Sequence, residues 1–346
     1  MRSFGRPGKM RIGVNTRMPG SVRAVAADAD EPVMAVAKAY RLFARREARG
    51  RSAAYESLAE SVAEDVAVAG FVASLPPGKR QPNLLFAAAC YLLGAPPGIR
   101  QLRELASQSP AELAQVILAR RVQTNEPGRC AVLLPALAQL PQPLALIDVG
   151  ASAGLTLLLD RYSYDYAGRR IAGSDPHAPV LRCQPSGPVP VPPQVPAITW
   201  RAGLDLNPLD VTADDDVRWL SCLVWPGESD RAQRLAAAVA SARRDPPPVH
   251  RGDLLTGLPA LAAQAPPDAT LVVYHCSVLY QVPAREREQF AATVRRLGAR
   301  SLSSESPGIV PGTAMRALDD QMCVLARDGH AIATADSHGA WLHWLP

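Results

Sequence analysis

The chain has 346 residues, of which 48% are hydrophobic and 20% are charged. This composition is typical of a folded globular protein of one or two domains, and it excludes collagen-like, disulfide-scaffold and wholly disordered classes. The formal net charge is +5, but six basic residues within positions 1–23 supply +6, so the remainder is near −1. We therefore expect no nucleic-acid partner.

Residues 1–30 are predicted to be a disordered basic tail, or a start upstream of the true initiator, because their first 23 residues are basic without any acid. They lack an apolar segment, so they are not a secretory signal. The longest apolar stretch, residues 84–95, is shorter than the roughly 18–20 residues that cross a bilayer, so no membrane contact is expected. The six cysteines stand singly, without C-x-x-C or a nearby histidine. We expect a cytoplasmic protein without a metal site, and the oligomeric state stays open.

Residues 31–140 are predicted to form an all-helical cap domain. Apolar residues recur at helical spacing on both sides of Gly50. Pro82 and Gly94 mark the start and the end of one helix, since proline suits a first turn and glycine a C-terminus. Ser109 and Glu112 have the spacing of a capping box at the start of another helix.

Residues 141–346 are predicted to form a Rossmann-like domain, a doubly wound and mostly parallel sheet. The first strand is residues 144–149, a continuous apolar run typical of a buried parallel strand. The later strands are predicted at 198–205, 249–253, 270–275, 299–303, 322–326 and 331–335. Helical stretches lie between several of them, as right-handed crossovers require. The proline-rich segment 174–196 is predicted to be a long surface excursion.

Residues 147–155, IDVGASAGL, are predicted to form a strand, a turn of small residues and a helix start. Small residues let the backbone approach a ligand closely, and a helix start offers unpaired amides. The pattern D-x-G-x-S-x-G resembles the first motif of class I S-adenosylmethionine-dependent methyltransferases, with Ser152 where glycine is commoner. The resemblance implies that Gly150, Ala151 and Gly154 surround the methionine part of S-adenosylmethionine and that Asp148 lies beneath it or binds its ammonium group.

Two later acids extend this resemblance. Asp205, followed by Leu206, resembles the acid of the second strand that takes the ribose hydroxyls, and Asp165 is the alternative by spacing. Asp253, followed by Leu254, resembles the acid that contacts the adenine amino group, although a helix cap is the alternative. The cofactor-binding residues implied are Asp148, Gly150, Ala151, Ser152, Gly154, Asp205, Leu206, Asp253, Leu254 and His275.

The segment 268–287 resembles the fourth strand of these enzymes and the loop that faces the transferred methyl group. His275, Cys276 and Tyr280 are therefore active-site candidates, and His275 is either a general base or a structural histidine. Glu305 and His338 follow later strands and are candidates for the same cleft, because ligands bind at the carboxyl ends of parallel strands. We take His275, Tyr280 and Glu305 as catalytic candidates.

Polar side chains before two predicted helices are candidates for substrate binding. They are Arg121, Asn125 and Glu126 in one cluster and Arg80 in the other, joined by His338. Such groups can hold a carboxylate by charge-assisted hydrogen bonds, whereas helix caps and a solvated surface are the plainer alternatives.

The same glycine loop also matches G-x-S-x-G, the nucleophile elbow of serine hydrolases, with Ser152 as the nucleophile. Against it, about 140 residues without a predicted strand precede the loop, where a hydrolase has several strands. From about residue 35 the chain resembles a family of uncharacterised proteins from high-GC bacteria that is regarded as methyltransferase-like. The segments that carry this resemblance are 43–47, 77–84, 121–126, 200–210, 224–226, 304–308 and 336–342.

The sequence thus predicts an S-adenosylmethionine-dependent methyltransferase acting on a small-molecule acceptor. Three alternatives stay open. One is another reaction of the same cofactor, aminocarboxypropyl transfer or cyclisation. The others are hydrolysis through Ser152 and a non-catalytic nucleotide-binding module.

Overall fold

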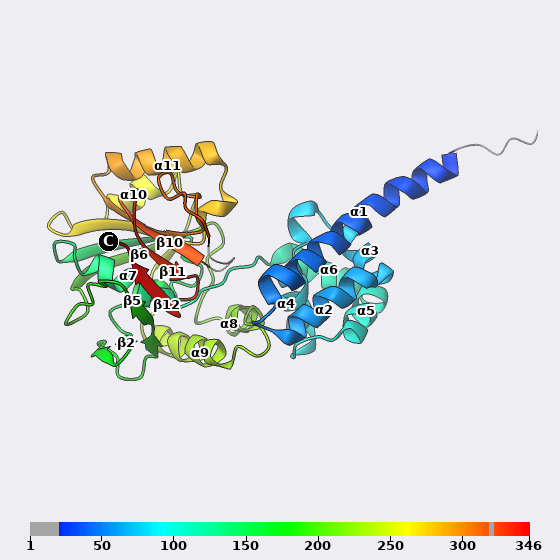
Figure 1. The fold of residues 1–346 in the computed structure, drawn as a ribbon, viewed down its shortest axis with the longest axis horizontal. Coiled ribbons are helices and arrows are strands. Elements are labelled where there is room, and N and C mark those ends of the chain that lie inside the picture. Colours follow the sequence, from blue (N-terminus) through cyan, green and yellow to red (C-terminus); the bar gives the residue numbers. More distant parts are fainter. Residues whose placement is uncertain (1–20, 318–321) are drawn as a thin grey trace, which may run out of the picture.

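The computed structural model describes residues 21–317 and 322–346, with side chains from residue 31 onward. Residues 1–20 of the predicted tail lie outside the described residues, and from Ser21 the chain is helical, in α1 (Ser21–Phe43). A helical region comes first, and an α/β region with a large, mostly parallel sheet follows it, as the sequence predicts (Figure 1).

Residues 31–140 contain no strand. After α1 and a π-helical turn (Ala44–Ala48), the helices are α2 (Ala53–Glu64), α3 (Val66–Ser74), α4 (Pro82–Leu93), α5 (Ile99–Gln108) and α6 (Pro110–Ala119). Helix α4 starts at Pro82 and ends at Gly94, whose φ of 75° is the left-handed conformation that glycine adopts without strain, as predicted. The side chain of Asp65 caps α3 by accepting hydrogen bonds from two first-turn amides.

The predicted capping box at Ser109 is wrong. The Ser109 side chain makes no cap hydrogen bond, and α6 starts instead with Pro110 in its first turn. Ser109 also ends α5, where its amide donates to the carbonyl of Leu105. The backbone of Ser109, with φ of −133° and ψ of 44°, is not in the extended conformation from which an N-cap side chain reaches the first-turn amides.

One large sheet forms the centre of the α/β region. Its strands are β1 (Leu144–Val149), β5 (Gln184–Ser186), β6 (Ile198–Asp205), β7 (Val249–Arg251), β8 (Thr270–Cys276), β9 (Arg300–Glu305), β10 (Met322–Arg327), β11 (His330–Asp336) and β12 (Trp341–Trp344). Their spatial order is β5-β12-β11-β10-β9-β8-β1-β6-β7. Strands β7, β6, β1, β8 and β9 are mutually parallel. In chain order these five strands are arranged 3-2-1-4-5, so the order reverses between β1 and β8.

The last strands depart from the parallel alternation that the sequence pattern predicted. Strand β10 pairs antiparallel with both β9 and β11, and β11 pairs antiparallel with β12. Only Asp328 and Gly329 connect β10 to β11, and both have positive φ, of 52° and 81°. Two residues with positive φ make a tight hairpin turn, which leaves no room for a crossover helix.

The proline-rich excursion is not a plain loop. Its surroundings form a small second sheet of β2 (Ser163–Tyr166), β3 (Arg169–Ile171) and β4 (Val180–Arg182). Strand β5, which also lies within the excursion, pairs in parallel with β12 and so extends the edge of the large sheet.

Helices cover both faces of the large sheet. Residues of α10 (Leu258–Ala262) and α11 (Ala284–Arg296) share one hydrophobic core with Ile147 and Val149 of β1. Residues of α7 (Arg129–Leu137) and α9 (Ser229–Arg244) share the other core with Leu144 and Leu146. Alternate side chains of a strand point to opposite faces, so β1 lies at the centre of three layers (Figure 1).

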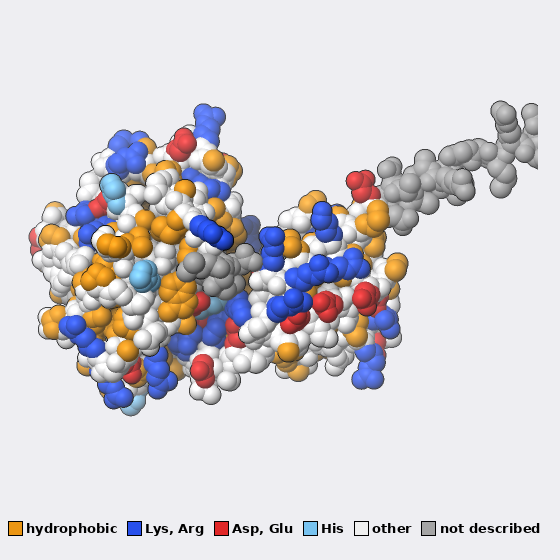
Figure 2. All heavy atoms as spheres, in the orientation of Figure 1, with side chains coloured by type: hydrophobic (Ala, Val, Ile, Leu, Met, Phe, Trp, Pro, Cys, Tyr) orange, Lys and Arg blue, Asp and Glu red, His pale blue; other side chains and the backbone are white. Residues whose placement is uncertain are grey.

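The two regions share a continuous core. Trp225, which follows α8 (Asp214–Cys222), packs against Phe43 and Tyr55 of the helical region, with ring centroids 5.3 and 5.9 Å apart. On the face shown in Figure 2, basic and acidic side chains gather where the two regions meet. Among the described residues, no helix is both long and apolar enough to span a membrane.

Candidate functional site

A cavity of about 300 Å³ lies at the carboxyl ends of β1, β6 and β8, next to the point where the strand order reverses. Its wall is formed by the glycine loop after β1, by the ends of β6 and β7, by the loop after β8, and by residues 121–124 together with Arg129. Open α/β sheets bind their ligands at such a point. We call it the glycine-loop cavity.

Three residues of the glycine loop have the left-handed backbone conformation, with positive φ. Gly150, Ser152 and Gly154 have φ of 78°, 53° and 72°. A Cβ atom on Gly150 would lie 2.3 Å from Cγ2 of Val278, so only glycine fits there. The predicted helix after the loop is wrong, because residues Leu155–Leu158 form only a short 3-10 turn. The amide of Leu155 is already bonded to Asn125 Oδ1, so this turn offers no free helix N-terminus.

Asp205, at the end of β6, holds the glycine loop and lines the cavity. One of its carboxylate oxygens accepts from the Ser152 amide at 2.8 Å, and the other accepts from the Asn207 amide at 2.7 Å. Asp165 lies instead in β2 and lines a different hollow of the surface. Of the two acids considered for the second strand, only Asp205 therefore lies beside the glycine loop.

Arg129 lines the cavity, although it was not among the site residues selected from the sequence. It is the first residue of α7, and its guanidinium donates to the carbonyls of Ser337 at 3.0 Å and of Cys276 at 3.2 Å. Those contacts hold it at the end of β8. In the sequence, Arg129 stands just after Arg121, Asn125 and Glu126, in the same polar cluster before the first strand, and this could have identified it.

Asp148 and Thr156 form a buried pair beneath the loop. The hydroxyl of Thr156 donates to the carboxylate of Asp148, which is 4% exposed and is not part of the cavity wall. Burial raises the pKa of Asp148 to about 7, and the nearby Asp205 charge adds to this, while the Thr156 hydrogen bond and Arg129 oppose it.

His275 and Glu305 form a second buried pair, behind the loop that follows β8. The imidazole Nδ1 lies 2.7 Å from Glu305 Oε1, which also accepts from the amides of Val278 and Leu279. Burial opposes ionisation of Glu305, but these hydrogen bonds and the histidine bring its pKa below the usual value. Neither side chain lines the cavity. The pair thus holds the loop that does.

The cavity brings together seven of the residues that the sequence selected. They are Arg121, Gly150, Ser152, Asp205, Leu206, Leu254 and Tyr280. Its wall also includes Cys276, a further active-site candidate, and several residues that the sequence did not single out, such as Val149, Gly252 and Val282. Apolar wall residues belong to no recognisable sequence motif, so only the folded structure shows that they line the cavity.

Other selected residues have structural contacts elsewhere. Asn125 clamps the glycine loop, because its amide donates to the Ala151 carbonyl and its oxygen accepts from Leu155. The carboxylate of Asp253 accepts from the amides of residues 255 and 256, in the turn before α10, so it does not cap this helix, whose N-cap is Gly257. Arg80 donates to the Leu75 carbonyl at 2.8 Å and is not part of the cavity wall.

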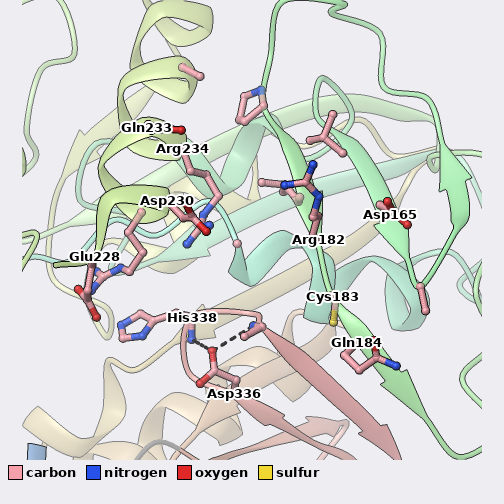
Figure 3. A pocket seen from close by; sticks show the side chains of 18 of the residues that line it. Asp165, Arg182, Cys183, Gln184, Glu228, Asp230, Gln233, Arg234, Asp336 and His338 are labelled. Atoms are coloured by element: carbon pink, nitrogen blue, oxygen red, sulfur yellow. Dashed lines mark hydrogen bonds and ion pairs between the residues drawn. The ribbon is translucent and has the colours of Figure 1, made fainter. Parts of the chain in front are cut away.

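His338 lines a larger hollow of about 1000 Å³ between α9, β4 and the turn after β11 (Figure 3), and Glu126 contacts this hollow's wall through Arg231 and Arg234. Glu126 is 3% exposed and is paired with Arg231 at 2.9 Å and Arg234 at 2.6 Å. His338 is in the wall of this hollow, with its backbone amide bonded to Asp336. We call this hollow the outer groove.

The hydroxyl of Ser152, the nucleophile of the hydrolase alternative, donates to the carbonyl of Gln123 at 3.5 Å. Within residues 31–317 and 322–346, no hydrogen bond joins this hydroxyl to a histidine. The same residues contain no group of three or more His, Cys, Asp or Glu side chains arranged to hold a metal ion.

The family model described as uncharacterized protein conserved in bacteria (DUF2332) matches residues 37–344. No curated protein and no solved structure matches the chain.

Proposed function

The chain belongs to DUF2332, a family of uncharacterized proteins conserved in bacteria, and we propose that it binds S-adenosylmethionine and transfers the methyl group to a small-molecule acceptor. One observation supports this above all. The glycine loop after β1, the acid at the end of β6 and the loop after β8 line a single cavity at the carboxyl ends of the sheet. This is where the resemblance to class I methyltransferases requires them.

The groups around the cavity suit the parts of this cofactor. Asp205 would accept a hydrogen bond from a ribose hydroxyl at Oδ2, which accepts only from the Ser152 amide, whereas Oδ1 accepts from the Asn207 amide and, at 3.5 Å, from the Gln123 side chain. Arg129 would pair with the methionine carboxylate, because its hydrogen bonds use only Nε and Nη1. Leu206 and Leu254 would contact the adenine ring. A volume of about 300 Å³ is at the lower end of the range for small-molecule sites.

S-adenosylmethionine supplies an electrophilic methyl group, so the protein has mainly to position two reactants in line and to exclude water. Tyr280, on the loop after β8, lines the cavity and is 54% exposed, so it lies at the mouth, where an acceptor would enter. His275 and Glu305 would act through this loop, by fixing the amides of Val278 and Leu279. We therefore assign them a positioning role in place of direct proton transfer.

The test is isothermal calorimetry of the full chain with S-adenosylmethionine and with its demethylated product. We expect both to bind, and Asp205→Ala to lower affinity about 10- to 150-fold, the value of a hydrogen bond to a charged group. Asp253→Ala is the matched control. It removes an acid that also follows a strand, but one that bonds its own turn and is not part of the cavity wall.

Binding of neither compound would refute the proposal. Binding with transfer of a larger fragment, identified by product mass, would favour aminocarboxypropyl transfer, and binding without turnover would favour a non-catalytic module. Labelling of Ser152 by a fluorophosphonate would favour the hydrolase.

A further inference from the structure

A second, smaller cavity of about 140 Å³ lies between the helical region and the α/β region, and we call it the arginine chamber. Arg51 and Asn83 reach it from the helical region, and Trp225, Arg231 and His338 reach it from the α/β region. Polar groups from five separate segments of the chain therefore converge on one small space, which is a general property of ligand sites.

The chamber connects the two larger spaces. Val122 and Thr124 belong both to its wall and to the wall of the glycine-loop cavity. Arg51, Arg231 and His338 belong both to its wall and to that of the outer groove, on which Figure 3 is centred. A small molecule in the chamber would thus lie between the groove that opens to solvent and the proposed cofactor site.

Glu228 bridges the two arginines. It accepts from Arg51 Nη2 at 2.7 Å and from Arg231 Nη1, and Arg231 Nε is bonded to Glu126 at 2.9 Å. A guanidinium has five N–H donors, so both arginines keep donors for a ligand. Arg51 is held in addition by Trp225, since its guanidinium carbon lies 4.2 Å from the ring centroid. The donors are therefore fixed in place before any ligand arrives.

The wall of the chamber holds two arginines, Arg51 and Arg231, and one acid, Glu47. Burial lowers the pKa of His338, and the charges of Arg231, Arg129 and Arg51 lower it further. Glu126 and Glu228 lie among these charges, because each of them pairs with Arg231. The N–H donors that Arg51 and Arg231 keep free favour a carboxylate on the ligand over a neutral group.

Asn83 is a second, independent indication that the chamber binds a ligand. Its side-chain oxygen is buried, and it receives no hydrogen bond from the residues that the structure describes. A buried acceptor without a donor is unfavourable, so such groups usually have a partner when the site is filled. A hydroxyl or amino group on a ligand would supply that donor.

We propose that the arginine chamber binds a small carboxylate that carries a neighbouring hydroxyl or amino group, with Arg51 and Arg231 holding the carboxylate and Asn83 the neighbouring group. A monoanion fits better than a phosphate dianion, because Glu228 already neutralises part of the arginine pair. That this carboxylate is the methyl acceptor rests on the proposed function, whereas the binding site itself does not.

The probe is lactate, a carboxylate with an adjacent hydroxyl, measured by saturation-transfer difference NMR on the full chain. We expect lactate to bind at millimolar concentration. Lactamide has the same shape without the charge, so its binding should be at least about 10-fold weaker. Phosphate that displaces lactate at lower concentrations would refute the choice of a carboxylate.

Arg51→Met should weaken lactate binding about 10- to 150-fold, the value of hydrogen bonds to a charged group, and Arg51→Lys should weaken it less. Arg49→Met is the matched control, because Arg49 is two residues away and pairs with Glu56 on the surface. Equal lactate binding by Arg51→Met and Arg49→Met would overturn the proposal, as would no lactate binding by the unmodified chain.

Calorimetry with S-adenosylmethionine on the same variants separates the two proposals. Arg51 is not in the wall of the glycine-loop cavity, so Arg51→Met should keep cofactor affinity within about 3-fold. Lactate binding without cofactor binding would refute the proposed function alone. Cofactor binding without lactate binding would refute the chamber alone.

Discussion

Gly150→Ala is expected to destabilise the protein by more than its backbone conformation alone predicts. With φ of 78°, an alanine at this position costs about 1–2 kcal/mol. The new methyl group would also lie 2.3 Å from Cγ2 of Val278, and overpacking of this kind costs about 1–3 kcal/mol. Together these predict a loss of about 2–5 kcal/mol in the free energy of unfolding.

Val278 cannot move aside freely, because its amide is bonded to the buried Glu305 at 2.8 Å. Val278→Ala should therefore relieve the contact. In the double variant, the loss should be smaller than the sum of the two single losses by about 1–3 kcal/mol, as expected for residues in direct contact.

Gly94→Ala is the control. Gly94, at the end of α4, has nearly the same φ, 75°, but nothing lies within 4 Å of the place that a methyl group would take there. Guanidinium unfolding of the full chain, followed by tryptophan fluorescence, measures all four variants. A loss for Gly150→Ala no larger than that for Gly94→Ala would refute the reasoning, and so would additive losses in the double variant.

Two further predictions concern buried charges. Glu126→Ala leaves Arg231 buried without this partner and should cost about 3–5 kcal/mol, whereas Glu56→Ala breaks only a surface pair and should cost at most about 1 kcal/mol, as measured by thermal unfolding. Equal shifts in Tm would contradict this. Asp148 has a folded-state pKa of about 7, above its unfolded value near 3.9, so its contribution is present below about pH 4 and is lost as pH rises toward 7. The free energy of unfolding of Asp148→Asn, relative to that of the unmodified chain, should therefore rise by roughly 2–4 kcal/mol from pH 5 to pH 8. Urea unfolding of both proteins at the two pH values measures this. The same free-energy difference between the two proteins at pH 5 and at pH 8 would refute the prediction.

The central strand could be predicted because its signal is local. All six residues of β1 are buried and five of them are apolar, a local pattern that needs no distant partner to be recognised. The hairpin of β10 and β11 was missed, although Asp328-Gly329 is a strong turn signal, because the preceding alternation of strand and helix favoured another crossover. Strands β3 and β4 have three residues each, which is too short for a period to show.

The roles of polar side chains were harder to predict, because each depends on a partner far along the chain. Glu126 is paired with Arg234, 108 residues later, and Glu305 bonds the amide of Val278. The sequence shows that such groups exist, but only folding decides whether they face a cavity or one another. Asp205 lies beside the glycine loop because β1 and β6 are neighbours, and this could be predicted from strand order.

The segment 120–128, along which the chain passes from the helical region to the α/β region, also limits how the protein can be cut or extended. Its residues 121–124 are in the cavity wall, and Asn125 clamps the glycine loop, so added residues here would displace both. The proline-rich stretch 187–197 has no such contact with the cavity. A peptide tag or a circular-permutation break belongs in that stretch, and expression of the two regions as separate fragments would divide the wall of the site.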